Sequence, residues 1–276
     1  MKRLFAIVMV TLTVLSVGGV IIYSVHKRAA TGGASPEIHF AQEKIDVQTG
    51  TDDEALLEGV TATDPEDGDV TDSIMVESIS HFTEQNVVDV TYVAYDSQNH
   101  VTRAVRQVHY TDYIPPRFSM SGPMLFLSKN VNDMLNYVGA TDVIDGDISV
   151  KAHASFDDTT IALATVGTHN VEISVTNSLG DTSRLVVPVK VVEDVPHSES
   201  IPLKTYLVYI KKGASFDPAF YLVNSDQAQG GSTMGESTIQ ISSNVNPVTA
   251  GVYSVDYSLI KNEMISAMTR LIVVVE

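Results

Sequence analysis

The sequence predicts an all-β protein in which three tandem β-sandwich domains follow an N-terminal transmembrane helix. Three observations lead to this architecture: a long apolar segment near the N-terminus, apolar residues that alternate along many short segments, and a motif that occurs twice. The chain of 276 residues has room for two or three domains of about 80 to 100 residues each.

The apolar segment covers residues 4–25 and contains no charged residue. As a helix it would be about 33 Å long, enough to cross a bilayer. This length favours an uncleaved signal anchor over a cleaved signal peptide, although cleavage after Ala34 is the alternative. We therefore expect residues 1–28 to be a membrane anchor or signal segment, and residues 29–36, which are mostly small, to be a linker.

Charge and composition exclude several classes of function. The chain has 17 Lys and Arg residues against 34 Asp and Glu residues, so it offers no basic surface for phosphates and nucleic acid is not an expected partner. It has no cysteine, which excludes disulfides, thiolate metal ligands and thiol nucleophiles. Basic residues flank both ends of the apolar segment, so the positive-inside rule does not fix its orientation. The acidity of the remaining chain favours export, because an anionic cytoplasmic leaflet repels it.

Alternating apolar residues predict β-strands along the rest of the chain. No helical period is sustained after Glu37, whereas every second residue is apolar in many short segments. Three sets are each expected to share one face of a strand: Val88, Val90, Tyr92 and Ala94; Val171, Ile173 and Val175; and Val255, Tyr257 and Leu259.

An internal repeat sets the domain organisation. "ATDPEDGDVT" at 62–71 returns as "ATDVIDGDIS" at 140–149, an offset of 78 residues. "VTYVAYDSQNHVTR" at 90–103 aligns with "VEISVTNSLGDTSR" at 171–184, an offset of 81. Such offsets predict one domain that occurs twice, with a loop three residues longer in the second copy.

A third, weaker copy completes the predicted order of domains. Residues 249–275 resemble residues 165–191 but lack the acidic motif. The chain then divides at two segments that contain proline, because proline has no backbone donor for a continuing strand. The predicted domains are residues 37–112, 113–193 and 194–276, the last being a degenerate copy.

The order of these motifs resembles the immunoglobulin-like repeats of bacterial surface proteins, of the hyalin-repeat and pesticidal-crystal-protein types. The resemblance is good over residues 37–193 and weaker over residues 194–276. Members usually carry glycine in the late turn "DSxGN", where we align Gln98 in the first domain and Gly180 in the second. The resemblance implies disulfide-free Ig-like sandwiches on the outside of a bacterial cell, which act as spacers, stalks or adhesive modules and perform no catalysis.

The acidic motif allows two interpretations. Ca²⁺ takes six to eight oxygen ligands, and the candidates are Asp64, Glu66, Asp67, Asp69 and Asp72 in the first copy, and Asp142, Asp145 and Asp147 in the second. The alternative is a surface turn, because Asp-Gly is a strong hairpin dipeptide and flanking Asp side chains bond backbone N–H groups. The turn is favoured, because Pro65 and Glu66 become Val143 and Ile144, so that the turn skeleton repeats and the number of ligands does not. A carboxylate pair for glycoside hydrolysis is disfavoured on an exposed loop.

Two functions follow from these expectations, and neither is enzymatic. The first is a single-pass membrane protein whose extracellular C-terminal body serves as a spacer or interaction stalk on a bacterial cell surface. The alternative is a Ca²⁺-dependent adhesin that binds a carbohydrate or a protein through end loops or through aromatic residues of the third domain. A Lys44–Asn99 isopeptide bond is a covalent possibility in a cysteine-free sandwich.

Overall fold

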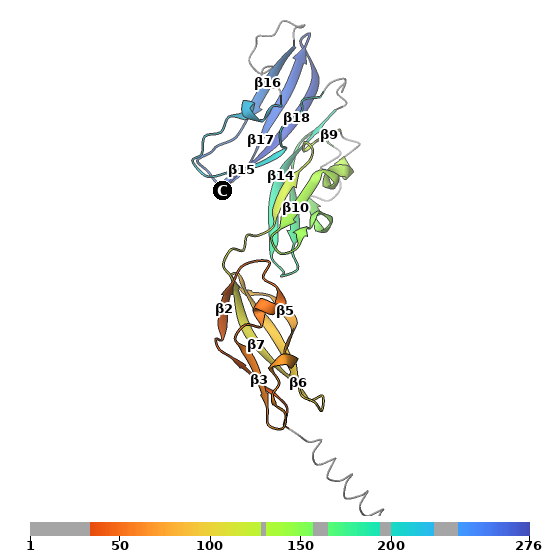
Figure 1. Ribbon diagram of the computed structural model, residues 1–276. Helices are drawn as coiled ribbons and strands as arrows, with labels where there is room; N and C mark the ends of the chain where they lie inside the picture. The colour runs from red at the N-terminus through yellow and green to blue at the C-terminus, as the bar shows by residue number, and fades with distance from the viewer. Residues whose placement is uncertain (1–33, 128–130, 157–164, 194–199, 224–236) are drawn as a thin grey trace, which may run out of the picture. The chain divides into compact units, whose positions relative to one another are not determined.

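The computed structural model is an all-β protein, as the alternation predicts. It describes residues 34–127, 131–156, 165–193, 200–223 and 237–276. The chain divides into two compact units, Met1–Asp112 (unit 1) and Tyr113–Glu276 (unit 2), which are described separately below. For the described residues, Figure 1 shows strands in both units, connected within each unit by loops and short helical turns.

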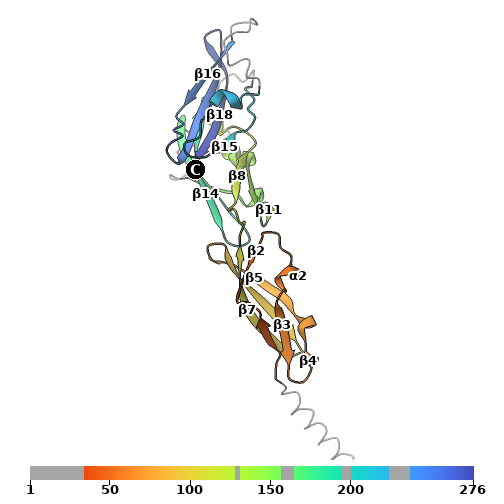
Figure 2. The ribbon, with the colours of Figure 1, turned by 60° about the vertical axis from the view of Figure 1, so that its left-hand side comes forward.

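Unit 1 contains two sheets. The small sheet has the order β1-β3-β4 and the large sheet the order β2-β7-β6-β5. Their bounds are β1 Glu37–Phe40, β3 Val60–Asp64, β4 Gly68–Asp69, β2 Lys44–Val47, β7 Val101–Tyr110, β6 Val87–Tyr95 and β5 Met75–Glu84, with α2 at Asp53–Leu56 and η1 at Thr71–Ser73. Neighbouring strands are antiparallel except for β2 and β7, which are parallel. Both sheets can be followed in Figure 2, the small one by β3 and β4 and the large one by β5 and β7.

The core of unit 1 lies between these two sheets. The predicted inward face of β6, Val88, Val90, Tyr92 and Ala94, is fully buried, which confirms the strand and its phase. Phe40 of the small sheet packs on Tyr92 of the large sheet, with ring centroids 5.4 Å apart. This contact makes the unit a sandwich of two facing sheets.

Unit 2 contains three sheets, two of which repeat unit 1. Their orders are β8-β10-β11 and β9-β14-β13-β12. The bounds are β8 Arg117–Met120, β10 Val138–Asp142, β11 Gly146–Asp147, β9 Leu125–Leu127, β14 Thr182–Val192, β13 Gly167–Thr176 and β12 His153–Phe156, with η2 at Val131–Tyr137 and η3 at Ser149–Lys151. Again the only parallel pair of these described strands joins an early strand, β9, to the last one, β14. We call β1–β7 the first repeat and β8–β14 the second repeat.

The third sheet of unit 2 repeats only half of this pattern. Its order is β15-β18-β17-β16, with β15 Leu207–Ile210, β18 Met264–Val275, β17 Gly251–Lys261, β16 Ser237–Ser243 and η5 at Pro218–Tyr221. The parallel pair β15–β18 and the antiparallel hairpin β17–β18 match the large sheet of the first repeat. Within the described residues this last sheet has no small partner sheet, in keeping with the missing acidic motif.

The last sheet is packed on both faces. On one face Val255, Tyr257 and Leu271 form a core with Leu203 and Leu222 of the preceding segment. On the other face Leu207, Ile272 and Val274 join the core of the second repeat, which includes the predicted inward residues Val171, Ile173 and Val175. The last sheet, which falls in the predicted third domain at residues 194–276, therefore shares a core and a compact unit with the second repeat.

The predicted membrane segment cannot be compared with this structure. Residues 4–25 and the start of the linker lie outside the described residues. In the part of the chain that the structure describes, no helix combines the length and the apolar character that crossing a membrane requires.

Candidate functional site

The repeated acidic motif forms a tight turn after the second strand of each small sheet. In the first repeat, Asp64 ends β3, and its Oδ1 accepts hydrogen bonds from the backbone N–H groups of Glu66 (2.8 Å) and Asp67 (2.9 Å). Gly68 follows with φ 76°, a left-handed conformation that glycine adopts without strain. We call residues 64–69 and 142–147 the acidic turns.

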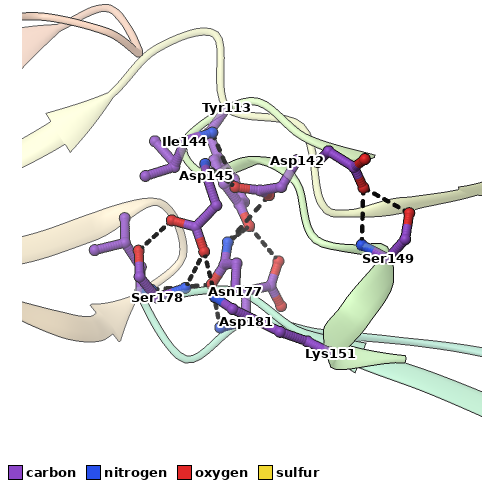
Figure 3. Close-up of polar contacts among 11 residues, drawn as sticks. Tyr113, Asp142, Ile144, Asp145, Ser149, Lys151, Asn177, Ser178 and Asp181 are labelled. Carbon is purple, nitrogen blue, oxygen red and sulfur yellow. Dashed lines mark hydrogen bonds and ion pairs between the residues drawn. The ribbon is translucent and has the colours of Figure 1, made fainter. Parts of the chain in front are cut away.

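A second turn lies against each acidic turn. In the first repeat it joins β6 to β7, and Ser97 donates its backbone N–H to Asp67 Oδ2 (2.6 Å) and its hydroxyl to Asp67 Oδ1 (3.0 Å). In the second repeat Ser178 makes the same two bonds to Asp145, at 2.8 Å and 2.5 Å (Figure 3). We call residues 96–100 and 177–181 the partner turns, and each hydrogen-bonded pair of turns a turn lock.

A third aspartate fixes the end of each acidic turn. Asp69 accepts from the N–H of Thr71 (3.0 Å), and Asp147 accepts from the N–H (2.9 Å) and the hydroxyl (2.6 Å) of Ser149. These hydrogen bonds lower the pKa of both carboxyl groups below the usual value for aspartate. Thr71 and Ser149 in turn accept from the backbone N–H of Ala62 and Ala140, so the turns are tied to the strands that precede them.

The buried centre of the turn lock differs between the repeats. In the second repeat, Asn177 donates from Nδ2 to Asp142 Oδ2 (3.2 Å) and to the Tyr113 hydroxyl (2.9 Å), and that hydroxyl donates to Asp181 (2.7 Å), as Figure 3 shows. Burial and the Asp181 carboxylate raise the pKa of Tyr113, so its hydroxyl keeps its proton. Every polar group at this centre has a partner.

In the first repeat two carboxylates occupy the same centre. Asp96 stands where the second repeat has Asn177, and Asp64 where it has Asp142; both are 5% exposed. Asp96 Oδ1 accepts from the N–H groups of Gln98 and His100, and its Oδ2 lies 2.6 Å from Nδ1 of His100. Asp64 Oδ2 is buried and has no hydrogen-bond partner.

The predicted calcium ligands do not converge on a common point. Asp64 and Asp142 bond to their own turns, Asp67 and Asp145 bond to the partner turns, and Asp69 and Asp147 bond to Thr71 and Ser149. Glu66 accepts from the side-chain amide of Gln98, and Asp72 is exposed on η1. Among the described residues, no group of three or more His, Asp or Glu side chains is placed to hold a metal ion. The geometry favours the turn interpretation, and calcium stays a prediction.

The structure corrects two expectations from the sequence, one about a glycine position and one about a covalent bond. The residue equivalent to Gly180 (φ 80°) is Asn99 (φ 67°) and not Gln98, and asparagine tolerates this left-handed conformation better than most residues. The Lys44–Asn99 isopeptide bond is excluded by strand register. Lys44 pairs with Gln107, six residues along β7 from Val101 and so about 20 Å from the start of that strand at about 3.4 Å per residue, and Asn99 lies in the turn before Val101.

The partner turns are the part of the site that the sequence analysis missed. Ser97 and Ser178 lie at the same place in the two aligned segments of the repeat, so the conserved spacing held the signal. Tyr113 could not be found this way, because it lies before the aligned segments of the second repeat.

Comparisons with known proteins do not assign the chain to a family. No family model matches. An uncharacterized 81.3 kDa protein of Acholeplasma phage L2 is 37% identical over 90 residues, which cover 33% of this chain and 11% of the phage protein. The chain therefore spans about a tenth of that relative.

Several solved structures show a weak likeness to this chain. They are the CBM51-2 domain in complex with GlcNAc and the INT domains of Clostridium perfringens ZmpB (16% identity, TM-score 0.23, 56% of this chain and 26% of that one) and the human desmocollin-1 ectodomain (10%, 0.18, 89% and 62%). A third is mouse cadherin-23 EC22-24 (11% identity, TM-score 0.18, 88% of this chain and 99% of that one). At these scores the likeness supports no conclusion about function.

Proposed function

We propose that this protein is a non-catalytic spacer or interaction stalk on the outer surface of a bacterial cell, held in the cell membrane by residues 4–25. The observation that carries the proposal is the way the first and last strands pair in each repeated sheet. An early strand lies parallel to the last strand in β2–β7, β9–β14 and β15–β18.

This pairing suits a chain that bears tension between its ends. Because the paired strands run in the same direction, the chain leaves each sheet at the end opposite to the start of the early strand. A pull along the chain therefore shears the whole row of hydrogen bonds of the pair at once, and does not break them one after another. The same arrangement in three successive sheets is what a load-bearing spacer requires.

The turn locks support the same function. Each one joins the small sheet to the large sheet of its repeat through carboxylate hydrogen bonds, between residues 30 or more positions apart. Hydrogen bonds to charged groups are stronger than neutral ones, so they can tie two sheets together in domains without disulfides. The acidic residues of the motif form hydrogen bonds with other residues of the same chain, so the motif stabilises the fold.

Single-molecule force spectroscopy tests the proposal. The full chain carries no cysteine, so thiols can be introduced at chosen positions. Pulling between the two chain ends should unfold the first repeat at a clearly higher force than pulling between cysteines at Asp89 and Gln107. These partly exposed residues pair near the open end of the β6–β7 hairpin, so the second geometry separates the two strands one hydrogen bond after another. Equal forces in the two geometries would contradict a load-bearing role.

Labelling of intact cells tests the location separately. With Val101→Cys in a bacterium that expresses the full chain, a membrane-impermeant maleimide should label the protein without lysis, because Val101 is about half exposed. A cysteine added before residue 4 should be labelled only after lysis. The opposite pattern would place the body in the cytoplasm.

A further inference from the structure

A polar cleft in unit 2 lies between the second repeat and the last sheet. Its volume is about 450 Å³, within the range of about 300 to 1,000 Å³ typical of small-molecule sites. One wall comes from β13 with Thr168 and Asn170, and the other from the end of β16 and the residues after it, Ser242, Ser243 and Asn244. The remaining lining residues are Pro188, Val252, Ser254, Asp256 and Arg270.

A buried ionic network forms the floor of this cleft. Arg270 is 3% exposed and binds both carboxylate oxygens of Asp256, from Nε at 2.6 Å and from Nη2 at 3.0 Å. Its Nη1 donates to the carbonyl of Pro188 (2.8 Å), and Lys190 Nζ donates to Asp256 (2.7 Å). Arg270 and Asp256 line the cleft, and Lys190 adds a second positive charge from outside the lining, so the network has an excess of positive charge in a strongly acidic protein.

The network holds the floor in a fixed geometry. Burial raises the pKa of Asp256, but the hydrogen bonds from Arg270 and Lys190 lower it by more than burial raises it. The net pKa lies below the usual value for aspartate, so Asp256 stays ionised at neutral pH. The guanidinium has five N–H donors in a rigid fork, and three of them are used in the hydrogen bonds to Asp256 and to the carbonyl of Pro188. Arg270 thus keeps donor capacity beside the cleft while its position is fixed.

The walls offer hydroxyl and amide groups to a ligand. The side-chain carbonyl of Asn244 accepts from the backbone N–H of Ser254, and the Ser243 hydroxyl accepts from the backbone N–H of Val245. These two side chains are therefore held in place. Within the described part of the chain, the side chains of Thr168, Asn170 and Ser242 make no hydrogen bond and are exposed. Groups that both donate and accept therefore line both walls.

We propose that this cleft binds a saccharide that carries a carboxylate, with the acid group directed to the positively charged floor and the ring hydroxyls to the two walls. A hydroxyl-rich ring matches walls of Ser, Thr and Asn, each of which can donate to one hydroxyl and accept from another. The carboxylate would balance the excess charge of Arg270 and Lys190. The described residues that line the cleft include no aromatic ring, so we expect weak binding that hydrogen bonds and charge dominate. The proposal does not depend on the spacer function.

Titration of the full chain with three probes tests the proposal. D-Glucuronate should bind saturably in calorimetry or in NMR, and D-glucose, which has the same ring without the acid, should bind about tenfold more weakly. Acetate, which has the acid without the ring, should be at least as weak as glucose. Glucuronate binding should also weaken as salt is raised, because ions screen the exposed part of the charge.

A pair of matched variants locates the site. Ser242→Trp should fill the cleft from one wall and weaken glucuronate binding by about tenfold or more. Gln240→Trp places the same side chain two residues away on the same exposed edge strand, outside the cleft lining, and should change binding less than about twofold. Both positions are exposed, so both variants should fold.

Three results would overturn the proposal. They are the absence of saturable glucuronate binding, equal binding of acetate and glucuronate, which would define a simple anion site, and equal weakening by the two tryptophan variants. None of these results bears on the force and labelling experiments, so the two proposals can fail independently.

Discussion

The first and second repeats have the same turn lock but different interiors. Both locks use an Asp to bond its own turn and a second Asp to bond a serine of the partner turn. Behind the locks, the first repeat buries Tyr92 and Arg106 where the second repeat buries Ile173 and Val187. The comparison shows that the turn lock depends on turn geometry, whereas the core next to it can contain a buried charged residue or only apolar residues.

Arg106 provides the largest expected effect. It is 1% exposed, and its guanidinium donates to the carbonyls of Leu56 and Glu58 and to the Tyr92 hydroxyl. Arg106→Ala should destabilise unit 1 by about 3 kcal/mol, because it leaves a cavity and unpaired buried groups. The measurement is urea unfolding of the full chain, with hydrogen exchange of β6 amides to identify the unit 1 transition.

Arg103→Ala is the matched control on the same strand. Arg103 bonds Glu77, but its side chain is 57% exposed, and exposed ion pairs contribute about 0 to 1 kcal/mol. A loss from Arg106→Ala no larger than this would show that the buried guanidinium is not needed, as in the second repeat.

Exchange of the residue at the centre of the lock gives the next largest effect. Asn177→Asp would place a carboxylate against Asp142 and remove the donor to Asp142 and Tyr113, so unit 2 should lose about 2 kcal/mol. The reverse change, Asp96→Asn, keeps an oxygen for the N–H groups of Gln98 and His100 and gives Asp64 Oδ2 a donor. It should stabilise unit 1 at neutral pH.

Opposite signs for these two substitutions are the decisive result, and thermal unfolding of the full chain measures both. Destabilisation of unit 1 by Asp96→Asn would mean that the contact between Asp96 and His100 matters more than the unpaired oxygen of Asp64.

Loss of the lock itself should have a smaller effect. Asp67→Ala and Asp145→Ala each remove two hydrogen bonds to a serine, and Asp145→Ala also removes an ion pair with Lys151. Each substitution should destabilise its own unit by about 1 kcal/mol. Asp72→Ala is the control, since Asp72 is exposed and should change stability by less than about 0.5 kcal/mol. Chemical unfolding with and without added Ca²⁺ would separate a turn from a metal site. A calcium-dependent rise in stability that Asp67→Ala abolishes would restore the calcium interpretation.

The sequence predicted the strands well and the contacts between the turns poorly. Alternation identified β6, β13 and the middle of β17, because each places one apolar face on a core. The lock joins Asp67 to Ser97, 30 positions apart, and strand register alone brings such residues together. The burial of Arg106 could not be predicted either, because two of its three hydrogen-bond partners are backbone carbonyls, which leave no mark in the sequence.

The third copy shows a different limit. Its weak similarity predicts a complete sandwich, but among the described residues only the large sheet is present, and one of its faces joins the core of the second repeat. Strand patterns show that a sheet has two covered faces, and they do not show which part of the chain covers each face.

Acid sensitivity provides the smallest and most specific comparison. Burial raises the pKa of Asp96, but the hydrogen bonds from His100 and Gln98 lower it by more than burial raises it, so its pKa lies below the ordinary value of 3.8. A lowered pKa contributes stability at neutral pH that is lost as the pH falls through the folded-state value. The first repeat should therefore take up a proton at Asp96 when it unfolds below about pH 4, whereas Asn177 takes up none. Stability measured from pH 5 to pH 2 should fall less steeply for Asp96→Asn than for the unaltered chain. Equal slopes would show that Asp96 titrates in the folded protein as it does in the unfolded chain, so that its hydrogen bonds add nothing in acid.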